Sequence, residues 1–249
     1  MQGMLKENLH YWTKKYGFKI IQWLEKRMER ASKFKLLAFY DPYILPWVKG
    51  LEDQWQIIRA ELDRLLEHWQ QLPNFQDISK DQTAITQDDH WKTVIFYGYG
   101  FKTDFNCAVC PITAEILSKI PGMTTAMFSI LSPGKIIPPH RGPYKGVLRY
   151  HLALKVPQDY KNCKIRVGET WLSWQQGKSI LFDDTYEHEV INNTNEDRVV
   201  LFLDIVRPFY WPISWLNRCV IFLIGRSSYV QQAKQNNAAW EKKLKKIFQ

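Results

Sequence analysis

The stretch "CKIRVGETWLSWQQGKSILFDDTYEHEVINNTNEDRVVLFLDIV", residues 163–206, decides the fold. It contains short runs rich in valine, isoleucine, leucine and aromatic residues, separated by glycine, asparagine and aspartate. Runs of this composition favour β-strands, and the residues between them favour tight turns. The stretch therefore predicts several closely spaced strands.

The same pattern begins earlier in the chain, just after Trp91. The runs that fit strands are residues 93–100, 125–131, 146–156, 163–167, 169–174, 179–182, 188–192 and 198–206. Eight short strands at this spacing indicate an all-β body, either a closed barrel or a two-sheet jelly roll of the cupin-like kind. We expect helices to pack on its outside.

Two segments show helical patterns. In residues 51–72, apolar side chains recur every three or four positions up to Pro73, which predicts one long helix that packs on the core. Residues 111–120 form the second predicted helix, because Pro111 suits a first helical turn. We therefore expect a helical extension over residues 1–90, a β-core over 91–210 and a basic, partly amphipathic helical tail over 211–249.

Net charge and hydropathy restrict the partners and the location of the protein. The 249 residues include 34 lysines and arginines against 25 acidic residues, a net charge of +9, which favours a polyanionic partner. Both ends of the chain, residues 5–35 and 211–249, mix basic with aromatic or aliphatic residues, and neither has 18 consecutive apolar residues. The sequence thus predicts a cytoplasmic protein that touches an anionic membrane surface peripherally, or whose ends pack on the core. No nucleic-acid partner is expected, because no nucleic-acid-binding motif is present.

Alternation along two of the predicted strands places polar side chains on shared faces. Arg149 and His151 project from the same side of their strand. In residues 198–206, Arg198 and Asp204 share one face, and both faces are otherwise mostly apolar. A strand of that kind is buried, so the Arg198 charge needs an anion, either Asp204, a loop or a ligand.

Two histidines in this region suit a metal site. His140 follows two prolines, which restrict its backbone, and His188 follows a turn that contains Asp183 and Asp184. Two imidazoles brought to one end of a barrel suit ferrous iron, for which two histidines and a carboxylate with open positions form the usual set of ligands. A single histidine of this kind more often has a hydrogen-bonded structural role than a metal-binding one, and two adjacent aspartates commonly form a turn.

The four cysteines offer little chemistry. Cys107 and Cys110 form a lone C-x-x-C pair, and no second ligand pair is found that would complete a zinc site. We interpret both residues as structural.

The strand motifs carry a family resemblance. The segments "FSILSPGKIIPPHRGPYKGVLRYHLAL" and 163–208 resemble the aspartyl/asparaginyl β-hydroxylase family of iron- and 2-oxoglutarate-dependent oxygenases, and the similarity spans residues 91–208. The resemblance implies a double-stranded β-helix of the jelly-roll type. It also implies Fe(II), 2-oxoglutarate and O₂ as cofactor, cosubstrate and oxidant.

The resemblance implies roles for individual residues. His140 and His188 would bind Fe(II), and Arg198, assisted by Ser129, would bind the remote carboxylate of 2-oxoglutarate. Arg149 and His151 would complete the cosubstrate pocket. Gly142 stands where the wider oxygenase superfamily has a third, carboxylate ligand; the family is similar in lacking it, which implies a water at that position with Asp184 behind it.

The expected activity is hydroxylation of an unactivated C–H bond. The substrate implied first is an Asp or Asn side chain in a peptide or on a carrier. A lipid A-type acyl chain is the alternative, because lipid A 2-hydroxylases belong to the same family and the basic, apolar ends of the chain suit a membrane surface. A non-catalytic cupin-like binding module is a further alternative.

Overall fold

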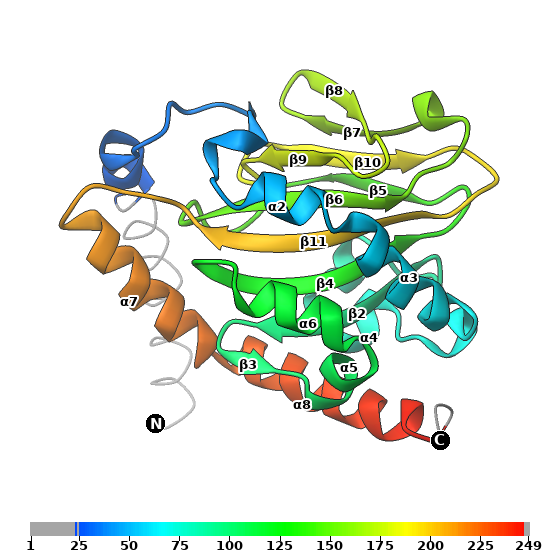
Figure 1. Cartoon of the computed structure of the whole chain (residues 1–249). Helices are drawn as coiled ribbons and strands as arrows, with labels where there is room; N and C mark the ends of the chain where they lie inside the picture. The colour runs from blue at the N-terminus through cyan, green and yellow to red at the C-terminus, as the bar shows by residue number, and fades with distance from the viewer. Residues whose placement is uncertain (1–22, 24, 247–249) are drawn as a thin grey trace, which may run out of the picture.

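Two antiparallel β-sheets form the centre of the protein, seen in a computed structural model that describes Trp23 and residues 25–246 (Figure 1). The larger sheet has the strand order β1-β9-β6-β11-β4-β2-β3. Its strands are β1 (Phe39–Tyr40), β2 (Trp91–Gly98), β3 (Phe101–Lys102), β4 (Met123–Leu131), β6 (Val147–Lys155), β9 (Ser179–Phe182) and β11 (Arg198–Val206).

The smaller sheet has the order β5-β10-β7-β8. Its strands are β5 (Ile136–His140), β7 (Cys163–Val167), β8 (Thr170–Ser173) and β10 (His188–Asn192). Apolar side chains of both sheets meet in one cluster, in which Ile165 and Val190 from the smaller sheet pack with Val200 and Phe202 from the larger. The fold is a double-stranded β-helix with flanking helices, as predicted.

All eight predicted strands are present, and four of them have the predicted bounds at both ends: β7, β9, β10 and β11. The sequence did not predict β1, β3 and β5. The first two have only two residues each, and β5 contains Pro138 and Pro139, which disfavour strands. β5 tolerates these prolines because it lies at the edge of its sheet, where fewer backbone N–H groups are needed for pairing.

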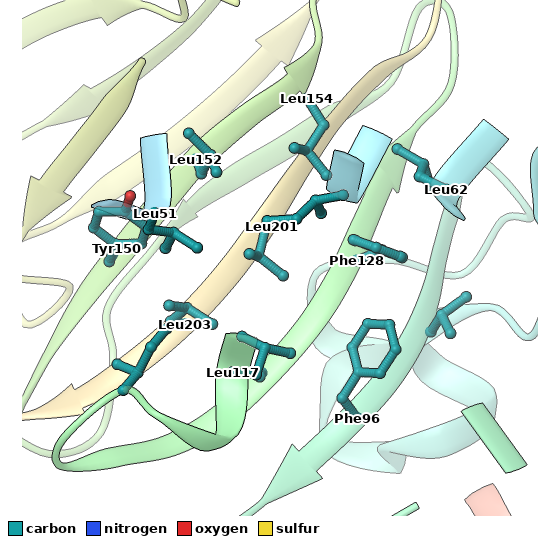
Figure 2. Close-up of a cluster of buried hydrophobic side chains, with 14 of the residues drawn as sticks. Leu51, Leu62, Phe96, Leu117, Phe128, Tyr150, Leu152, Leu154, Leu201 and Leu203 are labelled. Atoms are coloured by element: carbon teal, nitrogen blue, oxygen red, sulfur yellow. The ribbon is translucent and has the colours of Figure 1, made fainter. Parts of the chain in front are cut away.

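The predicted alternation along β11 is confirmed by the two faces of the larger sheet. Val200 and Phe202 face the smaller sheet, whereas Leu201 and Leu203 face the helices. Figure 2 shows the helix-facing side, where Leu201 and Leu203 lie near Phe128, Leu117 and other leucines. Strand β11 is therefore buried on both sides, which explains its nearly continuous apolar sequence.

Helices cover the outer face and one edge of the larger sheet. They are α2 (Val48–Glu52), α3 (Trp55–Leu66), α4 (Phe75–Ile78), α5 (Asp104–Val109), α6 (Pro111–Ser118), α7 (Ile213–Gly225) and α8 (Ser228–Leu244). Short 3-10 helices lie at Pro42–Ile44, Trp69–Gln71, Lys80–Ala84 and Tyr160–Asn162. α6 begins at Pro111, as predicted.

The prediction of one helix over residues 51–72 was wrong, because the chain breaks it into α2, α3 and a 3-10 turn. Two buried carboxylates hold the pieces at separate places. Glu52 accepts a hydrogen bond from the backbone N–H of Ser179 in β9, at 2.9 Å. Glu61 of α3 accepts from the N–H groups of Ile112 and Thr113 at the start of α6, which the positive end of that helix favours. Periodicity alone does not reveal such tertiary contacts.

The ends of the chain take different positions. Helix α7 runs along one side of the molecule and α8 passes below the larger sheet (Figure 1). No helix in the described part of the chain is long and apolar enough to cross a membrane. Most of the basic aromatic segment predicted for residues 5–35 lies outside the described residues. Strand β1 comes from the predicted N-terminal extension and pairs with β9.

Candidate active site

Two histidines face each other across neighbouring strands at one end of the β-helix. His140 ends β5 and His188 begins β10, and the two residues are direct partners in the antiparallel register. Their ring centroids lie 4.1 Å apart. Two residues 48 positions apart in the sequence therefore place their imidazoles side by side.

The hydrogen bonds of both rings select the same tautomer. Nδ1 of His140 lies 2.8 Å from the carbonyl oxygen of Pro138, and Nδ1 of His188 lies 3.0 Å from that of Tyr186. A carbonyl can only accept, so each Nδ1 carries the proton and each Nε2 keeps a free lone pair. Burial lowers the pKa of both rings, that of His188 to about 3. Both imidazoles are thus neutral, the form that binds metals.

A pocket beside the two rings collects six of the seven residues that the sequence analysis selected. These six are Ser129, His140, Arg149, His151, His188 and Arg198. The rest of its lining is apolar or aromatic and includes Trp91, Phe182 and Phe202. A concave apolar pocket with a few convergent polar groups is the usual form of a small-molecule site.

Arg198 has a charge that the described residues do not balance. Its side chain is 1% exposed, and no carboxylate of the described residues lies within ion-pair distance of it. Nε and Nη1 have no hydrogen-bond partner, and burial lowers the pKa of the guanidinium to about 10. The proposed alternative of a pair with Asp204 is wrong, because Asp204 binds Arg149. A buried, unpaired guanidinium fits a carboxylate ligand.

His151 and Ser129 complete the polar lining near Arg198. Neither ring nitrogen of His151 has a hydrogen-bond partner among the described residues, and burial keeps the pKa of the ring well below its ordinary value. Ser129 Oγ accepts a hydrogen bond from Nε1 of Trp91 at 3.0 Å, which leaves its own O–H free to donate elsewhere. The pocket thus offers unused hydrogen-bonding groups around one unpaired positive charge.

Comparison with known proteins identifies the family. Residues 52–208 match the sequence model of the aspartyl/asparaginyl beta-hydroxylase family, which is more than half of the chain. The chain belongs to this family. The matched segment thus includes α3, α6 and every strand of the two sheets except β1.

Individual relatives differ in how much of this chain they match. An ornithine lipid ester-linked acyl 2-hydroxylase from Rhizobium tropici is 42% identical over 230 residues, which covers 92% of this chain and 82% of the relative. The human aspartyl/asparaginyl beta-hydroxylase is 31% identical over 66% of this chain, which spans only 22% of the human protein. Among solved structures, a Pseudomonas putida prolyl-4-hydroxylase covers 65% of this chain and 99% of its own, at 13% identity and a TM-score of 0.40.

Asp184 lies beside Gly142, two residues after His140, but does not join the two histidines in a three-ligand cluster. Within the described residues, no group of three His, Cys, Asp or Glu side chains is arranged to hold a metal. A Cβ atom on Gly142 would lie 2.1 Å from Oδ2 of Asp184, so the carboxylate fills the space beside residue 142. Burial raises the pKa of Asp184 to about 6, although Arg149 opposes the shift.

Arg149 forms ion pairs with two buried carboxylates. Its Nη2 lies 3.0 Å from Oδ2 of Asp184, and its Nε lies 3.0 Å from Oδ1 of Asp204. The guanidinium also lies over the ring of Phe202, 4.4 Å from its centroid. Two carboxylates therefore balance the Arg149 charge, in contrast to that of Arg198.

Sequence reasoning missed two residues that support the pocket. Trp174 is fully buried, its ring stacks on His151, and Arg198 lies 4.6 Å from its centroid. Asp204 was considered only as a partner of Arg198. The face shared by Asp204 and Arg198 was visible in the alternation of β11, but the partner of each depends on the neighbouring strand β6, where Asp204 is opposite Arg149.

The remaining candidates have structural positions. Asp183 accepts hydrogen bonds from the N–H and hydroxyl of Thr185 and pairs with Arg207, so this first aspartate forms a turn. Cys107 and Cys110 are buried, unbridged and packed in the core, and burial raises the pKa of Cys110 to about 12. Their interpretation as structural residues agrees with this packing.

Proposed function

We propose that this chain is an Fe(II)- and 2-oxoglutarate-dependent hydroxylase that acts on an acyl chain of a membrane lipid. The observation that carries the chemistry is the shared pocket of the His140–His188 pair and the unpaired Arg198. Neutral imidazoles with free Nε2 atoms suit iron, and a buried guanidinium without a counterion suits the remote carboxylate of a keto diacid. When bound, iron, 2-oxoglutarate and O₂ supply the oxidising power that replaces a C–H hydrogen by hydroxyl, with succinate and CO₂ released.

The side chains of the pocket have separate tasks in this proposal. Arg198 and Ser129 bind the remote carboxylate, and the neutral His151 donates a hydrogen bond to the bound diacid. Arg149 is a positioning residue that orients Asp184. Oδ1 of Asp184 is buried without a partner, and we assign it to accept a hydrogen bond from a water in place of the missing third carboxylate.

The lipid substrate rests on the extent of similarity. A 230-residue match reaches well beyond residues 52–208, into segments outside the β-core, and the relative so matched is a lipid acyl 2-hydroxylase. The Asp or Asn substrate rests on similarity to the human protein. That similarity covers less of this chain and has a lower identity. We therefore place the lipid first and the amino-acid side chain second.

The test is a reaction with two substrate classes. Purified protein is incubated with Fe(II), 2-oxoglutarate and either membrane lipids or Asp- and Asn-containing peptides, with His140→Ala in parallel. We expect one added oxygen atom in a lipid acyl chain, together with succinate, and neither from the variant. Oxygen added to peptides alone would transfer the assignment to the amino-acid side chain. No iron-dependent succinate and no thermal shift with 2-oxoglutarate would favour a non-catalytic cupin-like module.

A further inference from the structure

Helix α7 is apolar on two sides, and among the described residues only one of these sides packs on the protein. Its inner side packs against Met28, Tyr144 and Phe209. The residues of that side are Ile213, Leu216, Val220, Ile221 and Ile224. A helix on the surface of a water-soluble domain normally places polar residues opposite such a stripe.

The outer side of α7 instead carries large exposed apolar side chains. Trp215 is 64% exposed, Phe222 58% and Leu223 63%, and Trp211, just before the helix, is 83% exposed. Residues 215, 222 and 223 are seven and eight positions apart, so they lie on one face. Together with the exposed Tyr210, these four residues form what we name the aromatic surface.

Positive charges accompany the aromatic surface, and negative charges are missing from its sequence. Arg226 lies over the ring of Phe222, 3.5 Å from its centroid, and Lys33 lies over Tyr210 at 5.5 Å. Arg218 is exposed on the same face as Trp215. Between Asp204 and Glu241 the chain has no aspartate or glutamate.

We infer that the aromatic surface docks on an anionic lipid bilayer. Tryptophan and tyrosine beside arginine and lysine are the side chains that favour the boundary between headgroups and acyl chains. Each basic residue near an anionic bilayer adds to the attraction, and no acidic residue of this segment opposes it. The charge pattern therefore selects an anionic bilayer over a second copy of this basic chain.

The aromatic surface is joined to the pocket through one loop. Residues 141–146 follow His140, and Tyr144 in this loop donates a hydrogen bond to Oδ1 of Asn217 at 2.7 Å. Nδ2 of Asn217 donates to the carbonyl of Gly146 at 2.9 Å. Docking through α7 would thus hold the end of the β-helix that carries His140 near the bilayer. This inference deepens the proposed function and rests on the lipid substrate proposed there.

The test is flotation of the full-length protein with vesicles. Phosphatidylcholine vesicles with and without phosphatidylglycerol are compared for the native chain and for the double variant Trp211→Ser, Trp215→Ser. Trp171→Ser is the matched control, because Trp171 is also exposed and stacked with a lysine, Lys164, but belongs to β8 in the smaller sheet. We expect binding to the anionic vesicles, about ten-fold or more weaker for the double variant and unchanged for Trp171→Ser.

Other outcomes would overturn the docking inference. Equal vesicle binding by the native chain and the double variant would do so, as would no binding to anionic vesicles. A dimer in sedimentation that the double variant abolishes, without vesicle binding, would assign the surface to a second copy. Succinate formation from 2-oxoglutarate is measured separately: vesicle binding without turnover would refute the hydroxylase proposal and leave the docking intact.

Discussion

The carboxylate of Asp184 occupies the space that a side chain on Gly142 would enter, with Oδ2 only 2.1 Å from the Cβ position. The backbone N–H of Gly142 also donates to the carbonyl of Asp184 at 2.7 Å. Arg149 prevents the carboxylate from moving away freely, because it binds the same Oδ2. The glycine at position 142, in place of a carboxylate ligand, and the Asp184 carboxylate beside it thus belong to one packing arrangement.

Gly142→Ala is expected to lower the free energy of unfolding by about 1–3 kcal/mol, because the new methyl group overpacks a buried site. Gly50→Ala is the control: no atom lies within 4 Å of the Cβ position there, and alanine favours helix α2. Chemical denaturation measures both. If Asp184→Ala fails to relieve the cost of Gly142→Ala in the double variant, the clash is not its cause.

Arg198 and Arg149 are expected to respond oppositely to replacement by methionine. Arg198→Met should leave the free energy of unfolding unchanged or higher, because it removes an unpaired buried charge. Arg149→Met should cost about 3–5 kcal/mol, because it leaves the carboxylates of Asp184 and Asp204 buried without their partner. Thermal and chemical denaturation without ligand measure this contrast. Equal destabilisation by both variants would contradict the assignment of Arg198 as an unpaired charge.

Arg198→Met is further expected to weaken 2-oxoglutarate binding by about 100-fold, because charge-assisted hydrogen bonds to the remote carboxylate are lost. Iron binding should change little. Calorimetry with 2-oxoglutarate and, separately, with Mn(II) in place of Fe(II) distinguishes the two effects. A parallel loss of metal binding would count against a role confined to the diacid.

Replacing either His140 or His188 by alanine is expected to abolish metal binding and succinate formation, because the remaining imidazole alone cannot hold the ion. His90→Ala is the control, since His90 is exposed and remote in sequence from both strands. Mn(II) titration and a succinate assay are the measurements. Retained metal affinity in either variant would show that the two rings do not share an ion.

Trp174→Leu is expected to weaken 2-oxoglutarate binding by about ten-fold, because the ring that supports Arg198 and His151 is lost. Its control is Phe128→Leu, which also shortens a fully buried aromatic side chain but on the helix-facing side of the sheet (Figure 2). Both variants should have a lower free energy of unfolding, and only Trp174→Leu should have a lower affinity for 2-oxoglutarate. Equal affinities for the diacid would remove Trp174 from the site.

The sequence alone determined eight of the eleven strands found in the described residues, and the faces of their side chains. A period of two depends only on the geometry of an extended backbone, so Arg149 could be placed with His151, and Arg198 with Asp204, without coordinates. Residue types then indicated two imidazoles and a buried guanidinium as the chemistry.

Tertiary structure decided which of these groups meet. The proline-containing β5 lies at the edge of its sheet, where His140 is opposite His188. Asp204 pairs with Arg149, and Arg198 lies over Trp174 without a counterion among the described residues. Tertiary structure also broke the predicted helix over residues 51–72 and left the outer side of α7 exposed among the described residues. Each outcome depends on contacts between segments distant in the chain, which local periodicity does not encode.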